Sequence, residues 1–238
     1  MSESRDPTRV LVVTAHPDDV DFGAAGSIAT WTDQGIAVTY CIVTDGAAGS
    51  AIPGVEAAAL RQIRQEEQRK AAAEVGVTDV HFLGYPDGSL VVSFELRRDI
   101  ARMIRIVRPD RVVCQSPERN WDRIRASHPD HLAAGEAALQ AVYPDARNPY
   151  AHPELLAAGL EPHVVDEVWL MASPRSTRGV DITATIERKL AALRSHHSQL
   201  AGTDNLEEMI RSWATANASA LGMPEGRLAE SFQVVDTR

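Results

Sequence analysis

Residues 10–19 read VLVVTAHPDD, and this stretch decides the fold. Its first six residues are almost all apolar or β-branched, a pattern that predicts a buried strand. A His-Pro-Asp-Asp segment follows directly, at residues 16–19. The same combination recurs downstream, where the apolar run of residues 111–115 precedes His-Pro-Asp-His at residues 128–131. We therefore expect two strand ends that each present histidine and carboxylate side chains.

Short β-rich runs alternate with longer helical patterns over the first two thirds of the chain. The predicted strands cover residues 9–15, 37–44, 79–83, 111–115 and 166–172, with a short β-like tail at 231–235. The predicted helices cover residues 21–34, 56–75, 94–107, 129–142, 184–195 and 205–221. The segment 143–162 contains four prolines and is expected to be an irregular surface excursion. This alternation indicates β-α-β units around a parallel sheet, in one α/β domain that spans residues 1–238.

Composition and charge exclude several functions. The 238 residues carry a net charge of −9, which argues against nucleic acid or an anionic membrane as the main partner. No apolar stretch approaches the roughly 20 residues of a membrane span, and residues 1–7 lack the hydrophobic core of a signal peptide. Cys41 and Cys114 lie inside apolar runs and are expected to be buried, without a disulfide or a metal. We expect a cytoplasmic protein with no membrane insertion.

Polar side chains follow each predicted strand. Ligands of open parallel sheets bind beyond the carboxyl ends of the strands, so these side chains mark a candidate site. They are, strand by strand, His16, Asp18 and Asp19; Asp45; Tyr85 and Asp87; Asn120, His128 and His131; and Arg175 and Arg178.

The two His-Pro-Asp motifs together offer the groups that a divalent metal ion and a water-activating base require. In a single turn, His16 and Asp19 are three residues apart and can face the same point. His128 and His131 have the same spacing, which leaves open whether one or both bind the metal. Asp18 points away from Asp19 in such a turn and is free to act as a general base.

The remaining acidic and histidine side chains have plainer interpretations. Whichever of His128 and His131 does not bind the metal could stabilise a developing oxyanion, with Asp130 holding that imidazole in its cationic form. Asp21 is interpreted as a carboxylate at a helix start. His196 and His197 end a predicted helix, where a site role and a favourable interaction with the helix dipole are equally supported. The following are interpreted as hydrogen-bonded or solvated: His81, His152 and His163.

With these motifs in place, the chain resembles the LmbE-like, or PIG-L, family of zinc-dependent N-acetylglucosaminyl deacetylases. The specific part is AHPDDVDFG at residues 15–23 together with HPDH at residues 128–131. Supporting matches are TDG at 44–46, R-x-x-E at 64–67, LGYPDG at 83–88, the K-x-x-A-L…H-x-S-Q pattern at 189–199 and AESF at 229–232. The resemblance implies a Rossmann-like three-layer α/β/α sandwich with a mostly parallel sheet.

The resemblance also implies a metal site and a reaction. His16, Asp19 and His131 would hold Zn²⁺, with Fe²⁺ or Co²⁺ as substitutes. The expected function is hydrolytic removal of an N-acetyl group from a glucosamine-containing small molecule. One alternative is an amidase that uses the same site on a thiol conjugate. Another is a non-catalytic, metal-stabilised scaffold or binding protein in a biosynthetic pathway, and a homo-oligomer is compatible with each.

Five further residues receive roles from the resemblance. Asp18 would be the general base that later protonates the leaving amine. His128, oriented by Asp130, would stabilise the tetrahedral oxyanion. Arg64 and Asp87 would contact the sugar or its aglycone.

The chain departs from the family pattern at Ala126, where many members carry Tyr or Asp. Any help that such a side chain gives to the oxyanion must come from another group here. The preceding segment, residues 118–125, contains three arginines, of which Arg123 and Arg125 suggest an anionic aglycone.

Overall fold

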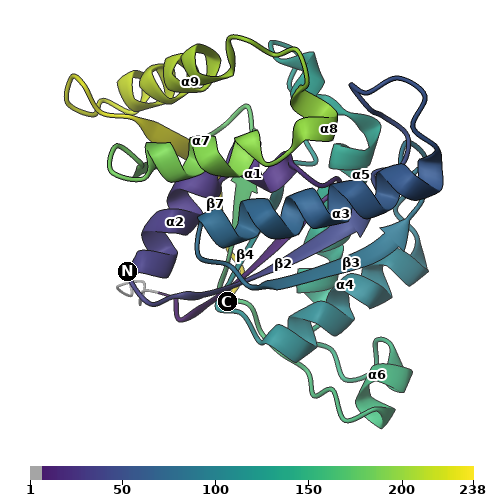
Figure 1. The fold of residues 1–238 in the computed structure, drawn as a ribbon. Helices are drawn as coiled ribbons and strands as arrows, with labels where there is room; N and C mark the ends of the chain where they lie inside the picture. Colours follow the sequence, from purple (N-terminus) through teal and green to yellow (C-terminus); the bar gives the residue numbers. More distant parts are fainter. Residues whose placement is uncertain (1–6) are drawn as a thin grey trace.

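The computed structural model describes residues 7–238 and contains a seven-stranded sheet of order β3-β2-β1-β4-β5-β7-β6 (Figure 1). Five strands are parallel: β1 (Arg9–Thr14), β2 (Ala37–Thr44), β3 (Asp79–Tyr85), β4 (Arg111–Gln115) and β5 (Glu167–Met171). Two strands extend one edge through antiparallel pairing: β7 (Ala229–Asp236) pairs with β5, and β6 (Arg178–Asp181) pairs with β7. Residues 1–6, most of the segment judged to lack a signal peptide, lie outside the described residues.

Helices cover both faces of the sheet, which confirms the predicted sandwich of three layers (Figure 1). One face carries α1 (Asp19–Gly23), α2 (Ala25–Asp33), α3 (Ala57–Glu74) and α7 (Ile186–Arg194). The other face carries α4 (Phe94–Val107), α5 (Pro129–Gln140), the π-helical turn η2 (Ala141–Asp145) and α6 (Pro153–Ala157). Two further helices, α8 (His197–Leu200) and α9 (Leu206–Ala220), follow α7, and α9 packs on α7 and β7.

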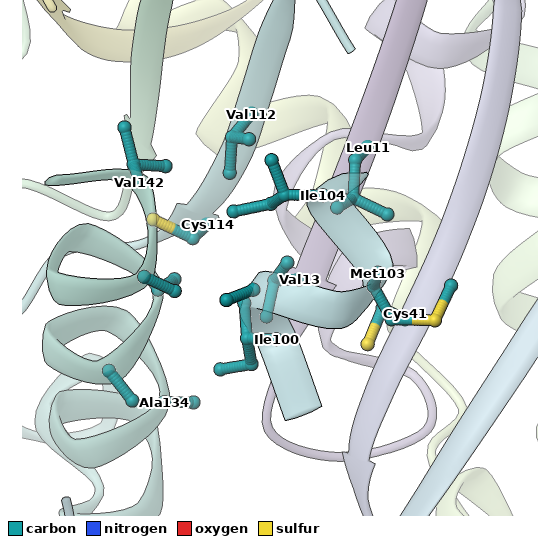
Figure 2. Close-up of a cluster of buried hydrophobic side chains, with 14 of the residues drawn as sticks. Leu11, Val13, Cys41, Ile100, Met103, Ile104, Val112, Cys114, Ala134 and Val142 are labelled. Atoms are coloured by element: carbon teal, nitrogen blue, oxygen red, sulfur yellow. The ribbon is translucent and has the colours of Figure 1, made fainter. Parts of the chain in front are cut away.

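The core follows from the alternation of side chains along the buried strands. Leu11 and Val13 of β1 point toward α4 and α5, as Figure 2 shows, whereas Val10 and Val12 pack on the opposite face. Cys41 and Cys114 are free thiols in the first of these clusters, so the expectation of buried, unpaired cysteines is confirmed.

The structure corrects several predicted boundaries. The helix expected at residues 21–34 is two helices, separated at Ala24, where the backbone has φ −146°. Gly23, the last residue of α1, lies close to Met171 of β5: a Cβ atom on Gly23 would be 2.6 Å from the Sδ atom of Met171. The helix expected at residues 129–142 ends at Gln140 because Pro144 interrupts its regular hydrogen bonding.

Four short elements were not predicted: the 3-10 helix η1 (Ile124–Ser127), β6, α6 and α8. Each has only four or five residues, and β6 has the sequence RGVD, without apolar alternation. Among residues 7–238, no helix has both the length and the apolar character required to cross a bilayer.

Gly135 allows α5 to lie directly against the end of β4. A Cβ atom at this position would be 2.1 Å from the carbonyl oxygen of Gln115. Alanine normally stabilises a helix relative to glycine, by up to about 1 kcal/mol. Here we expect Gly135→Ala to lower the free energy of unfolding by about 1–3 kcal/mol, because α5 must move away from the sheet. Urea denaturation followed by circular dichroism measures this difference.

Gly49→Ala is the matched control, since a Cβ atom on Gly49 would have no neighbour within 4 Å. We expect this variant to stay within about 0.5 kcal/mol of the wild type. Equal stability of the two variants would contradict the close packing of α5 on β4.

Candidate metal centre and active site

The parallel pairing of β1 with β4 brings the two His-Pro-Asp motifs together at one end of the sheet. His16 follows β1, while His128 and His131 lie at the start of α5. The three imidazole rings have centroids 5.0–5.3 Å apart. One nitrogen from each ring can be chosen so that all three lie within 4.8 Å of one another. Two motifs far apart in the sequence therefore form one site.

Asp19 connects two of these histidines. Its Oδ1 atom is 3.0 Å from Nε2 of His131, and its Oδ2 atom is 3.2 Å from Nδ1 of His16. Nδ1 of His131 donates to the carbonyl oxygen of Ala126 at 3.2 Å, so that Nε2 is the ring nitrogen that faces Asp19. The three side chains proposed as metal ligands thus lie side by side, and their role as ligands stays a prediction.

The carboxylates around the cluster favour the protonated, positively charged forms of His16 and His131. Burial alone would lower the pKa of His16, but the carboxylates of Asp19 and Asp87 outweigh it and raise that pKa to about 11. The pKa of His131 is also raised, since the attraction of Asp19 exceeds the effect of burial. Imidazole nitrogens and carboxylate oxygens are ligands of Zn²⁺, Fe²⁺ and Co²⁺, so this donor set fits such an ion.

A second group of candidate ligand atoms shares His16. Its Nε2 atom is 3.0 Å from Asp87 and 3.2 Å from Asp130, and one ligand atom from each of these three side chains lies within 4.8 Å of the others. Asp87, expected at the sugar, therefore lies against a proposed metal ligand.

Asp18 has an unusual backbone conformation beside the cluster. Its φ of 93° is in the left-handed region, and its backbone N–H donates to Oε1 of Gln68 at 2.8 Å. Burial raises the pKa of the Asp18 carboxyl to about 6, against the lowering effect of Arg64. A carboxylate with a pKa in this range is a suitable general base near neutral pH.

Arg64 is a buried cation that supports this turn. Its guanidinium donates to the carbonyl oxygens of Pro17 and Gly46 at 2.6 and 3.0 Å, and it lies 3.4 Å from the Asp18 carboxylate. These contacts tie the ends of β1 and β2 together. The contact between Arg64 and a sugar stays a prediction.

The structure corrects the expected contact between Asp130 and His128. The Asp130 carboxylate accepts hydrogen bonds from the backbone N–H groups of Gly88 and Leu90, and it faces His16. Residues two apart at the start of a helix do not face each other, so this carboxylate turns away from His128. His128 is oriented by the backbone N–H of Asp130, which donates to its Nδ1 at 3.2 Å.

This hydrogen bond also sets the tautomer of His128. An Nδ1 atom that accepts a hydrogen bond leaves the proton on Nε2. Burial and the nearby positive charges of His16 and His131 lower the pKa of His128, which favours the neutral ring. The side chain is thus a neutral Nε2–H donor, and not the cation that we expected.

Asp21 and His196 form a buried pair that the sequence did not reveal. Both are fully buried, and Nε2 of His196 is 2.8 Å from the Asp21 carboxylate. Gln68 donates to the same carboxylate at 2.9 Å while accepting from the backbone of Asp18. Asp21 lies in the first turn of α1, as the sequence indicated, and its carboxylate also links α1 to α3 and to His196 at the start of α8. The match to the family's H-x-S-Q pattern was the only signal for His196.

His81, His152 and His163 are hydrogen-bonded or ion-paired outside the site, as the sequence indicated. Each has a partner within 3.2 Å: Asp79 for His81, Asp145 for His152 and the carbonyl oxygen of Pro109 for His163.

A cavity of about 300 Å³ adjoins the centre. Asp19, His131 and Ala126 form its inner end, and α9 and β7 form its outer walls. Ala126, where many family members carry a polar side chain, therefore faces open space beside the proposed ligands.

Comparison with known proteins identifies the family. The family model described as PIG-L, GlcNAc-PI de-N-acetylase, matches residues 11–142, a range that contains both motifs. This range exceeds half of the chain. The chain belongs to the PIG-L family, which confirms the resemblance drawn from the motifs.

Relatives of this chain include several deacetylases. It is 36% identical to diacetylchitobiose deacetylase of Thermococcus kodakarensis, over 97% of this chain and 84% of the relative. It is 31% identical to a probable N-acetyl-α-D-glucosaminyl L-malate deacetylase 2 of Bacillus anthracis, over 81% of each chain.

Solved structures share the fold. N,N′-diacetylchitobiose deacetylase from Pyrococcus horikoshii superposes with a TM-score of 0.89 and 30% identity, covering 98% of this chain and 85% of the other. The 4-carboxy-2-hydroxymuconate hydratase GalB from Pseudomonas putida reaches 0.79 at 23% identity, covering 97% of each chain, and shows the fold alone. Since one fold serves both a deacetylase and a hydratase, the function must be argued from the site.

The buried Asp21–His196 pair should be important for stability. Removing one partner of a buried ion pair leaves the other uncompensated and typically costs about 3–5 kcal/mol. We expect His196→Ala to lower the free energy of unfolding by that amount in urea denaturation. His197→Ala, a change at the exposed neighbouring residue, should alter it by less than about 0.5 kcal/mol. A small effect at His196 would mean that Asp21 is satisfied without it.

Proposed function

We propose that this protein hydrolyses the amide bond of an N-acylated glucosamine unit in a small molecule, with acetyl as the expected acyl group. The observation that carries the proposal is the position of Asp18, a partly buried carboxylate beside a cluster of three histidines. The identity of about a third of the residues with diacetylchitobiose deacetylase supports this choice of substrate. A cytoplasmic location, a single domain and assembly into a homo-oligomer complete the proposal.

His16, Asp19 and His131 would hold the metal ion, Zn²⁺ or its substitutes Fe²⁺ and Co²⁺. When bound, such an ion supplies Lewis acidity: it lowers the pKa of water to about 7 and polarises an amide carbonyl. Asp130 and Asp87 orient the imidazole of His16 through its Nε2 atom. Partners of this kind fix the ring of a metal-binding histidine and increase its basicity.

Asp18 would move the proton during the reaction. It accepts a proton from the attacking water, whose oxygen bonds to the carbonyl carbon. The C–N bond then breaks, and Asp18 returns the proton to the amine nitrogen. The immediate products are a carboxylic acid, which keeps the oxygen and the second proton of the water, and a neutral amine on the sugar. Transfer of that second proton from the acid to the amine gives the final carboxylate and ammonium groups.

His128 would stabilise the negative charge that develops on the carbonyl oxygen when water adds to the carbonyl carbon. Its neutral ring presents Nε2–H as a hydrogen-bond donor, fixed by the backbone of α5. The proposal places the sugar on the β2–β3 side of the centre, where Arg64 and Asp87 lie.

Metal content tests the ligand assignment. We expect about one Zn²⁺, Fe²⁺ or Co²⁺ per chain in the purified wild type, by inductively coupled plasma mass spectrometry. His131→Ala should lose this metal, because it removes a ligand, while His197→Ala, prepared side by side, should keep it. A wild type that takes up no metal after reconstitution with zinc would overturn the metal centre.

Asp18→Asn tests the general base. Asparagine keeps the size of the side chain and tolerates the left-handed backbone conformation. We expect the variant to retain its metal and to lose at least about 100-fold in kcat, since it can no longer accept the proton. Amine release from N-acetylglucosamine and N,N′-diacetylchitobiose, detected with fluorescamine, provides the rate. Turnover near that of the wild type would refute the role of Asp18.

A further inference from the structure

The cavity beside the centre has mostly apolar walls. Its inner end is formed by Asp19 and His131, two of the proposed metal ligands. Six side chains from α1, β5, the segment before α7, and α9 line the space beyond: Phe22, Met171, Ile182, Ile210, Trp213 and Ala214. Ile182, Ile210 and Met171 are almost completely buried. Polar side chains contribute a smaller part of the wall: Gln115, Arg123, Arg125, Asn217 and Ser231. A substrate group that enters this cavity from the centre therefore meets mainly hydrocarbon.

Two charged side chains in the cavity wall, Lys189 and Glu230, are already paired within the protein. Lys189 donates to the carbonyl oxygens of Asp21 and Phe22 and to the Glu230 carboxylate, all within 2.9 Å. Glu230 also accepts from the backbone N–H groups at the start of α2. Neither residue needs a ligand to satisfy it. Against the apolar part of the wall, the hydroxyl groups of a sugar would lose their hydrogen bonds to water, at a free-energy cost.

The sheet order gives the centre two different sides. The strands β2 and β3 lie on one side of β1, and they carry the loops of Asp45 and Asp87. The strands β4, β5 and β7 lie on the other side, where the cavity opens. Arg64 and Asp18 contact each other on the first side, and neither lines the cavity.

The reaction determines which end of the substrate faces each side. Asp18 must reach the nitrogen of the amide in order to protonate it, so the sugar amine lies toward Asp18. The carbon substituent of the carbonyl group then points away from Asp18, toward Asp19, His131 and the cavity.

We propose that this cavity is a binding pocket for the acyl chain and accepts linear acyl groups longer than acetyl. This inference rests on the proposed amide hydrolysis. The methyl group of an acetyl fills little of 300 Å³, a volume at the lower end of ligand pockets. A chain of several carbons would bury its methylene groups against Ile182, Ile210 and Ala214. Arg123, which lies 5.3 Å above the ring of Trp213, limits the outer end.

A series of glucosamines that differ only in acyl length tests the pocket. We would compare N-acetyl, N-butyryl, N-hexanoyl and N-octanoyl glucosamine with the metal-loaded wild type and measure kcat/KM from amine release. Each methylene that the pocket buries should raise kcat/KM about 3- to 4-fold, until the chain outgrows the cavity. A parallel series of N-acetylglucosaminides with methyl to octyl aglycones should show no such increase.

A matched pair of variants on α9 locates the effect. Ala214→Phe fills the pocket and should reduce the ratio of N-hexanoyl to N-acetyl turnover by at least about 10-fold, the loss of two or more buried methylenes. Ala216→Phe makes the same change on the exposed side of the same helix and should leave that ratio and the basal rate unaltered. If Ala214→Phe fails to fold, Ile210→Ala enlarges the pocket and should shift the optimum to a longer chain.

Binding of the acid products gives a second readout that needs no turnover. By isothermal titration calorimetry, octanoate should bind the wild type and Ala216→Phe more tightly than acetate does, and Ala214→Phe should lose this preference. Flat dependence on acyl length, with measurable N-acetyl turnover, would overturn the acyl pocket alone. An increase with aglycone length that Ala214→Phe abolishes would also overturn it and assign the cavity to the aglycone. Absence of amine release from every glucosaminide would instead overturn the proposed function.

Discussion

The parallel pairing of β1 with β4 is the constraint on which the site depends. Val10–Val13 of β1 lie in register with Arg111–Cys114 of β4, so both strands end at the same level of the sheet. His16 and Asp130, which are 114 residues apart in sequence, come within 3.2 Å as a result. Gly135 lets α5 approach β4 closely enough to hold the second motif there. A shift of one residue in this register would separate the histidines and turn the strand side chains to opposite faces.

Several buried charges surround the histidine cluster, and the fold compensates each of them. Arg64 lies between Asp18 and Asp87, and Asp19 lies between His16 and His131. Behind this layer, Gln68 joins Asp18 to the Asp21–His196 pair and so holds the left-handed turn in place. Burial of unpaired charge is costly, and the same network that avoids this cost also positions Asp18. Stability and the geometry of the proposed reaction are thus provided by the same side chains.

The sequence predicted the parts of this arrangement that depend on local patterns. Strand β2 and helix α4 have the expected bounds, because their apolar periodicity is strong and their ends are marked by Gly, Pro or Ser. The site residues were located because they follow strands, at positions that any parallel sheet brings to one edge. Contacts that depend on side-chain direction were missed. The carboxylate of Asp130 faces His16 because of where α5 begins, and no spacing rule places His196 beside Asp21.

The region that matches the family model and the region that follows it have different roles in the proposed site. Residues 11–142 match the family model, and they contain the three histidines, Asp18, Asp19, Arg64, Asp87 and Asp130. Most of the residues that line the cavity, from Met171 to Ser231, come from later segments, chiefly β5, β7 and the helices α7 and α9. In the proposed reaction, the groups that act on the amide come from the first region, whereas the proposed acyl pocket is formed mainly by the second. Substitutions on α9 can therefore change the substrate without disturbing the groups that cleave it, because no proposed catalytic or metal-binding side chain lies on that helix.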